Sequence, residues 1–223
     1  VSGLPFPTAV AFTPTGDMFV ALKGGQVRVV DNDQLLSEPF LDISAVVHDN
    51  DDRGLLGITV HPQFPAEPYI YLAYTYDPPG TAPDQGWPVA GRVARVERFT
   101  ADAAADYQKV VEGSGLVLVG TQSLRENIGN ENDGRDQASV SCMTGGTLAG
   151  TPIDDCLASD ENSHTIGTVA FGNDGALFVT NGDGANYNSV DPRALLAQNI
   201  DSLSGKVLRI DPATGLGMPD NPY

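Results

Sequence analysis

The chain has 223 residues, of which 41% are apolar, so it is long enough to build one sizeable hydrophobic core. Its 29 acidic residues outnumber its 12 basic residues, and a formal charge of -17 excludes nucleic acid and anionic membranes as partners because it would repel both. No apolar run reaches the ~18 residues of a transmembrane helix, so the sequence predicts no membrane span.

The first predicted element is a hairpin over residues 9–22, AVAFTPTGDMFVAL, in which a turn separates two apolar strands. A short alternating strand, GQVRVVD (25–31), follows it. The same unit returns as GITVHPQFPAEPYIYLAYT (57–75) followed by ARVERFT (94–100), with a longer turn in the hairpin. In this second hairpin we expect His61 to stabilise the turn before Pro62 rather than to take part in a site.

A long insertion, residues 101–164, separates the second unit from the third. It contains both cysteines of the chain, Cys142 and Cys156, in a segment rich in Gly, Asp and Ser. Their closeness in sequence favours a disulfide over two free thiols, and the closed loop would stabilise the fold by about 3 kcal/mol on the chain-entropy model. A disulfide indicates an oxidising compartment.

The third unit comprises the hairpin TVAFGNDGALFVTN (168–181) and the strand GKVLRID (205–211). Between them, DPRALLAQNI (191–200) predicts one or two helical turns, with Asp191 as the cap and Pro192 in the first helical position. Repeated units of short strands are typical of β-propeller blades, and 25 glycines and 16 prolines agree with many turns. We therefore predict an all-β propeller.

Three blades cannot close a ring, because propellers typically have about 4 to 8 blades and an open arc leaves a blade face in water. The chain opens with neither a methionine nor a signal peptide, and it ends just after a strand. We therefore expect residues 1–223 to be the N-terminal half of a propeller domain, an excised or mature segment. The other half would come from the rest of the protein or from another chain.

The sequence contains no complete copy of several common functional motifs. DNDDRG (49–54) lacks the EF-hand ligand pattern, because Arg53 would occupy a ligand position and no Glu closes the loop. GSGLVLVG (113–120) has Leu118 where a dinucleotide loop needs its third glycine. The absence of HExxH, P-loop and GxSxG motifs removes support for zinc proteolysis, nucleotide hydrolysis and common serine-hydrolase chemistry.

The candidate chemistry lies in two loops of the third unit. His164 precedes the first strand of this unit, and Asp183 follows the second. Antiparallel strands return to the same end, so we expect the two side chains to meet. An imidazole held by a carboxylate is suited to act as a general base. The residues alone leave open the alternative that His164 only forms hydrogen bonds within its loop.

A third histidine, His48, lies among acidic residues, and we expect it to be solvated. The neighbouring cluster Asp49, Asp51 and Asp52 is more typical of a solvated loop than of a metal site.

Four stretches of the chain occur in the order found in the glucose/sorbosone dehydrogenase family, six-bladed propellers related to pyrroloquinoline-quinone-dependent aldose dehydrogenases. The resemblance covers nearly the whole chain, and it implies a six-bladed ring of which this chain forms about three blades. The stretches are RGLLGITVHPQF, SHTIGTVAFGNDGALFVTNGDG, AQNIDSLSGKVLRIDPATG and PDNPY.

The resemblance implies that His164 is the catalytic base and that Asp183 supports both the base and the cofactor pocket. It also implies that Asp52 and Asn188 contact cofactor or substrate. The implied reaction removes the proton of an aldose's anomeric hydroxyl and transfers a hydride to pyrroloquinoline quinone, giving a lactone. A calcium ion would polarise the quinone. Its ligands, and the cations that hold the quinone's carboxylates, are expected mainly in the other half of the ring.

The chain departs from the family at two positions, Ile166 and Thr168, and Asp52 is a shorter acid than usual. We expect each of the three to reshape the pocket. The main hypothesis is a secreted sugar dehydrogenase, extracellular or periplasmic, that acts on a small sugar. One alternative is a non-catalytic propeller that binds a glycan or a protein, which the two departures favour. Another is a calcium-dependent lactonase-like hydrolase, for which the sequence offers no convincing set of metal carboxylates.

Overall fold

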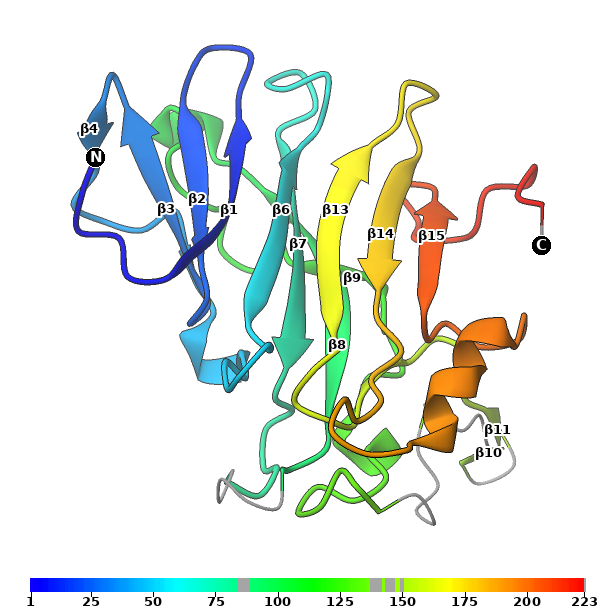
Figure 1. Ribbon diagram of the computed structural model, residues 1–223. Helices are drawn as coiled ribbons and strands as arrows, with labels where there is room; N and C mark the ends of the chain where they lie inside the picture. The colour runs from blue at the N-terminus through cyan, green and yellow to red at the C-terminus, as the bar shows by residue number, and fades with distance from the viewer. Residues whose placement is uncertain (84–88, 137–141, 143–146, 149–150, 223) are drawn as a thin grey trace.

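The computed structural model describes residues 1–83, 89–136, 142, 147–148 and 151–222 (Figure 1). Strands dominate this part of the chain, and the sheets are antiparallel. The predicted all-β class and propeller-type architecture are confirmed. No helix among the described residues is long and apolar enough to cross a membrane.

The first sheet contains the first predicted hairpin and the strand that follows it. Its strands lie in the order β1-β2-β3-β4, and β5 also pairs with β3. These strands are β1 (Pro7–Phe12), β2 (Met18–Leu22), β3 (Gln26–Asp31), β4 (Gln34–Leu35) and β5 (Leu41–Asp42).

The second and third sheets repeat this design. In the second sheet, β6, β7 and β8 form the repeated unit, while β9 and β12 both pair with the outer side of β8, so the insertion returns twice to the same strand. The third sheet has the order β13-β14-β15. The strands are β6 (Leu55–Val60), β7 (Tyr69–Tyr76), β8 (Arg92–Thr100), β9 (Leu116–Val119), β12 (Leu157–Ser159), β13 (Ile166–Phe171), β14 (Leu177–Asn181) and β15 (Lys206–Ile210).

Short elements fill the connections. One of them, η4, begins as predicted: a side-chain oxygen of Asp191 accepts a hydrogen bond from the backbone N–H of Arg193 (3.0 Å), and Pro192 opens the helix. It is a 3-10 helix. The short elements are η1 (Ser44–Val46), η2 (Ala103–Ala105), η3 (Arg125–Asn127), η4 (Pro192–Gln198), β10 (Thr147–Leu148) and β11 (Thr151–Pro152).

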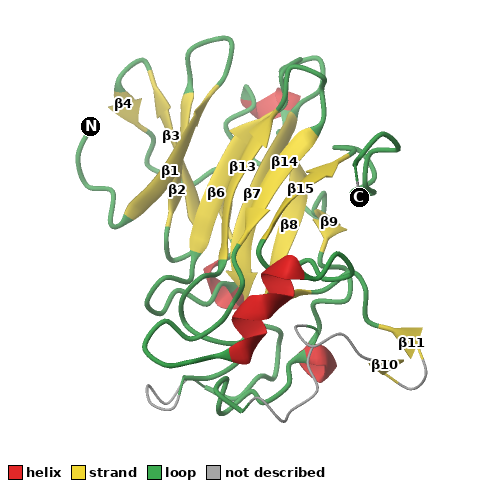
Figure 2. Cartoon of the chain, turned by 45° about the vertical axis from the view of Figure 1, so that its right-hand side comes forward, coloured by secondary structure: helices red, strands yellow, loops and turns green. Residues whose placement is uncertain are grey.

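The three sheets stand side by side like neighbouring blades (Figure 2). Their first strands, β1, β6 and β13, are adjacent and run in the same direction, as the innermost strands of a propeller do (Figure 1). A Cβ atom at Gly57 of β6 would lie 2.5 Å from the carbonyl oxygen of Gly167 in β13, so this close approach requires glycine. The three strands line a cavity of about 340 Å³, which corresponds to part of a central channel.

The two largest hydrophobic clusters of the described residues lie between the blades. Phe19 and Val29 of the first blade pack with Leu55 and Ile70 of the second. Residues of the second blade pack in turn against the third, and Ile166 is fully buried in this cluster. The pleat of β13 directs this side chain into the core, so Ile166 does not line an open pocket, and its effect on the shape of the pocket remains a prediction.

The predicted disulfide between Cys142 and Cys156 is present, with a Cα–Cα distance of 5.5 Å. It closes a loop with a sequence separation of 14 just before β12. The bridge therefore anchors the segment that leads into the His164 loop.

Candidate active site

His164 and Asp183 meet at one end of the third blade, as the sequence predicted. His164 lies at the entry to β13, and Asp183 lies just beyond the end of β14. Nδ1 of the imidazole is 2.9 Å from Oδ1 of the carboxylate. The imidazole is 44% exposed and the Asp183 side chain is 25% exposed, so the pair is accessible to a ligand.

Backbone conformation and a backbone hydrogen bond hold the His164 loop against the loop of Asp183. His164 has a φ of 52°, in the left-handed region that histidine adopts more readily than most residues. Its carbonyl oxygen accepts a hydrogen bond from the backbone N–H of Gly184 (2.9 Å). A Cβ atom at Gly182 would lie 2.0 Å from the same carbonyl oxygen, so only glycine fits there. The GDG segment is therefore shaped to receive the His164 turn.

The hydrogen bonds around Asp183 define the role that the imidazole can play. The backbone N–H of Ala185 also donates to Oδ1 of Asp183 (3.0 Å), which orients the carboxylate. A carboxylate only accepts hydrogen bonds, so it favours the tautomer of a neutral imidazole in which Nδ1 donates to Asp183 and Nε2 carries the lone pair. This tautomer suits a general base whose protonated form is stabilised by a neighbouring anion. The ring of Tyr187 lies 6.4 Å from the imidazole, centroid to centroid.

Arg53 is a residue of this site that the sequence analysis missed. Its side chain is fully buried beneath the loop that leads to His164. Nη2 donates to the carbonyl oxygens of Ser159 (2.6 Å), Asp160 (3.2 Å) and Glu161 (2.9 Å), and Nε donates to Oγ of Ser159 (3.2 Å). The forked guanidinium thus holds three consecutive carbonyl groups of the His164 loop. The sequence shows an arginine directly before the GLLG strand, but it gives no sign that this side chain is buried.

Arg193 fixes the same loop from the other side. Its guanidinium contacts carboxylate oxygens of Asp191 (2.7 Å), Asp160 (3.3 Å) and Glu161 (3.7 Å), and all four side chains are nearly buried. Burial alone would raise the pKa of Asp191, but hydrogen bonds from Arg193 and from backbone N–H groups outweigh it and lower that pKa below its ordinary value. The acidic part of the SDENSH segment is therefore neutralised inside the protein.

The other two predicted site residues lie near this pair but do not join it. The backbone N–H of Asp52 donates to the carbonyl oxygen of Asn162 (3.1 Å), so Asp52 lies beside the His164 loop with an exposed side chain. Asn188 is exposed beyond Asp183. Among the described residues, neither side chain shares the hydrogen bond between His164 and Asp183. Their contacts with a ligand remain predictions.

The other two histidines, His48 and His61, have contacts that point to structural roles. His48 is only 7% exposed, so the expectation that it is solvated is wrong. Its backbone N–H bonds to the carbonyl oxygen of Thr75 (3.0 Å), because the segment passes against the end of β7. His61 agrees with its predicted turn role: Nδ1 accepts from the backbone N–H of Gln63 (3.2 Å), and burial lowers the pKa of this imidazole.

The match to a family profile decides where this chain belongs. The sequence profile of the family described as "Glucose / Sorbosone dehydrogenase" matches residues 4–141 and 153–223. The chain belongs to the glucose/sorbosone dehydrogenase family. This match confirms the resemblance drawn from the sequence motifs.

Solved structures and a curated relative agree with this family. The chain is similar to a Thermus thermophilus oxidoreductase described as a glucose dehydrogenase, with 26% identity, a TM-score of 0.62 and coverage of 100% of this chain and 48% of that chain. It has the fold of the PQQ-bound aldose sugar dehydrogenase of Streptomyces coelicolor, with 20% identity, a TM-score of 0.62 and coverage of 100% and 49%. Hedgehog-interacting protein of Mus musculus is 25% identical over 140 residues, 59% of this chain and 19% of that protein.

The chain therefore spans about half the length of these solved dehydrogenases and about a fifth of this curated relative.

The residues present fit one part of a quinone site and not another. His164 and Asp183 form an accessible imidazole–carboxylate pair, which is the kind of group that the sugar side of a quinone site needs. The three cations near this loop, Arg53, Arg193 and Lys206, are held by the protein's own carbonyl or carboxylate oxygens. In the described part of the chain, no three His, Cys, Asp or Glu side chains are placed to hold a metal ion. In the described part of the chain, the residues thus fit the sugar-facing side of a quinone site but not its calcium ion.

Proposed function

We propose that the protein is a quinoprotein sugar dehydrogenase that oxidises the anomeric hydroxyl of an aldose to a lactone. The contact between His164 and Asp183 carries this proposal, because an accessible imidazole that is oriented by a carboxylate is suited to act as a base. Membership of the glucose/sorbosone dehydrogenase family supports it.

In this reaction, Nε2 of His164 accepts the proton of the anomeric hydroxyl while a hydride leaves the anomeric carbon. Asp183 holds the ring and stabilises the imidazolium that forms. Pyrroloquinoline quinone, when bound, supplies the two-electron acceptor for that hydride. Asp52 and Asn188 are exposed close to the two loops and would contact the sugar or the cofactor. Arg53 and Arg193 keep the His164 loop in position.

We further propose that residues 1–223 are the N-terminal half of a propeller whose other blades complete the pocket. Apolar side chains on the free faces of the outer blades support this arrangement: Val10 and Phe12 on β1 are 52% and 63% exposed, and Val207 on β15 is 67% exposed. The other half would contribute the calcium ligands and the cations that hold the quinone's carboxylates. The disulfide supports an extracellular or periplasmic location.

A second candidate function is binding of a protein or glycan without catalysis. The similarity to Hedgehog-interacting protein favours it, because that relative is named for an interaction with another protein. In this case, the loops around His164 would form a recognition surface, and the histidine would not be needed as a base.

The deciding experiment titrates pyrroloquinoline quinone with calcium into the complete protein and then measures dye reduction with a panel of aldoses. His164→Gln is the test variant, and His61→Gln is the matched control at a structural histidine. We expect cofactor binding and sugar-dependent reduction that only His164→Gln abolishes. If the protein is a folded, closed ring and still binds no cofactor at micromolar concentration, the dehydrogenase is excluded and the binding protein is favoured.

A further inference from the structure

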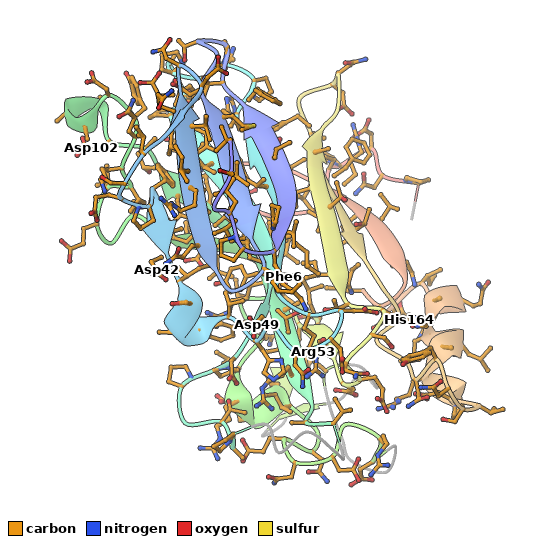
Figure 3. The ribbon with its side chains drawn as sticks, turned by 60° about the vertical axis from the view of Figure 1, so that its left-hand side comes forward. Phe6, Asp42, Asp49, Arg53, Asp102 and His164 are labelled. Atoms are coloured by element: carbon orange, nitrogen blue, oxygen red, sulfur yellow. A yellow bond between two sulfur atoms is a disulfide. The ribbon has the colours of Figure 1, made fainter. Side chains whose placement is uncertain are left out.

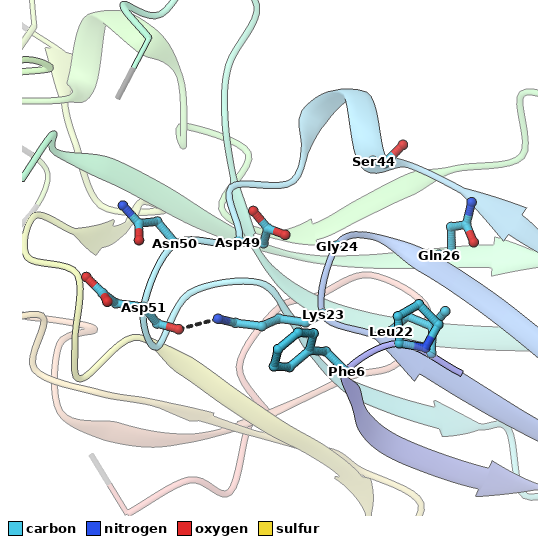
Figure 4. Close-up of a pocket in the computed structure, with 10 residues that line it drawn as sticks. Phe6, Leu22, Lys23, Gly24, Gln26, Ser44, Asp49, Asn50 and Asp51 are labelled. Carbon is cyan, nitrogen blue, oxygen red and sulfur yellow. Dashed lines mark hydrogen bonds between the residues drawn. The ribbon is translucent and has the colours of Figure 1, made fainter. Parts of the chain in front are cut away.

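A second cavity, of about 640 Å³, lies at the end of the first blade, and we call it the blade-one pocket (Figure 4). Figure 3 places its residues Phe6 and Asp49 at the same end of the sheets as Arg53 and His164. Its volume is in the range of small-molecule binding sites, about 300–1,000 Å³. The lining side chains that matter for its chemistry are Phe6, Lys23, Gln26, Ser44, Asp49 and Asp51.

Phe6 forms an apolar wall of the pocket, and its side chain does not pack in the hydrophobic core. Its side chain is 79% exposed, and its φ of 45° lies in the left-handed region, which is uncommon for a bulky residue. The backbone N–H of Lys23 donates to the carbonyl oxygen of Phe6 (2.9 Å) and holds this conformation. The fold thus presents an aromatic ring to solvent at the edge of a cavity.

Polar groups lie across the pocket from this ring. Figure 4 shows Asp49, Ser44 and Gln26 on the side opposite Phe6. The amide nitrogen of Gln26 donates to Asp42 (2.8 Å), which fixes the orientation of the amide. A Cβ atom at Gly24 would lie 3.4 Å from a carboxylate oxygen of Asp49, so this carboxylate stands close to the backbone of the pocket wall.

Hydrogen bonds connect a residue that lines the blade-one pocket to the loop that carries His164. The side chain of Asp51 accepts a hydrogen bond from the side-chain amide of Asn162. Asn162 precedes His164 by two residues, and such a segment spans at most about 7 Å. The ammonium group of Lys23 donates to the carbonyl oxygen of Asp51, which ties the first blade to the same loop.

From these contacts we infer that the blade-one pocket is a subsite for a neutral pyranose ring of an oligosaccharide whose reducing end reaches His164. A pyranose has an apolar C–H face that can pack on Phe6, and edge hydroxyls that can donate to Asp49 and Gln26. The carboxylates of Asp49 and Asp51 disfavour an anionic ligand, and they do not form a metal site in the described part of the chain. This inference deepens the proposed function and rests on it for the reacting end of the sugar.

The test compares glucose with cellotriose and maltotriose as substrates of the complete, cofactor-loaded protein. Phe6→Ala removes the apolar wall, Phe6→Trp retains it, and Val111→Ala is the control at an exposed apolar residue of the insertion, outside both cavities. We expect Phe6→Ala to lower kcat/KM for at least one trisaccharide by about tenfold, equivalent to ~1.4 kcal/mol, while glucose is unaffected. Phe6→Trp and Val111→Ala should behave like the wild type.

Binding of the same trisaccharides, measured by calorimetry without cofactor, separates this inference from the proposed function. Trisaccharide binding that Phe6→Ala weakens supports the subsite even in a protein that oxidises no sugar. The opposite result would be a protein that oxidises both glucose and trisaccharides. If Phe6→Ala and Asp49→Asn then change neither the ratio of kcat/KM for trisaccharide to that for glucose nor the binding of trisaccharide, the subsite is overturned and the dehydrogenase is not.

Discussion

Nδ1 of His164 lies 2.9 Å from Oδ1 of Asp183, although the two residues are separated by 19 positions and lie in different loops. The strands β13 and β14 bring them together, because an antiparallel pair returns the chain to the end from which it started. The same end carries the acidic loop of the second blade and the blade-one pocket (Figure 3). One end of the blades thus collects the candidate chemistry.

Asp183→Asn tests the orientation of the base. An asparagine amide can no longer stabilise the imidazolium, so we expect kcat for aldose oxidation to fall by about tenfold or more, but by less than in His164→Gln. Steady-state dye reduction measures this effect, with Asp201→Asn as a control in a neighbouring loop. Equal activity of Asp183→Asn and wild type would show that the contact is only structural.

Arg53→Lys tests the support of the His164 loop. A single ammonium cannot serve three carbonyl groups and a hydroxyl in the fork geometry of a guanidinium. Leaving buried acceptors unsatisfied should lower the free energy of unfolding by about 3 kcal/mol. Urea unfolding measures this change, and Arg209→Lys, on an exposed ion pair with Asp174, should have a smaller effect. Similar losses in both variants would contradict the role assigned to Arg53.

Acid should destabilise the loop through Asp191. Its pKa is lowered in the folded protein, so the carboxylate contributes stability that is fully present above its unfolded pKa, about 3.9. That contribution is lost as the pH falls through the lower, folded pKa. Compared with wild type, Asp191→Asn should therefore show a weaker loss of stability below about pH 4 in urea unfolding at several pH values. Parallel pH profiles would rule out this contribution.

Reduction of the disulfide should destabilise the chain without changing its fold. On the chain-entropy model, a loop with a sequence separation of 14 accounts for about 3 kcal/mol. Cys142→Ser combined with Cys156→Ser should lower the midpoint of urea unfolding, and dithiothreitol should do the same to the wild type only. A midpoint insensitive to both treatments would indicate that the bridge adds no stability.

The sequence alone determined the strand plan of this protein. Alternation of apolar and polar residues and the turn residues between them are local features, so the three hairpins and the strands that follow them could be read directly. The meeting of His164 with Asp183 followed from the same plan, because it needs only adjacent antiparallel strands. The helical turn after Asp191 was equally local, since its cap and its proline are consecutive.

Only the tertiary structure decided which polar residues are buried. Arg53 meets Ser159 across a separation of 106 residues, and no local pattern encodes that contact. His48 lies among acids in the sequence but is buried where its segment packs against β7. The blade-one pocket likewise combines Phe6 with Asp49 from two blades. These features depend on how the blades pack, because burial and charge pairing are set by neighbours that are distant in the chain.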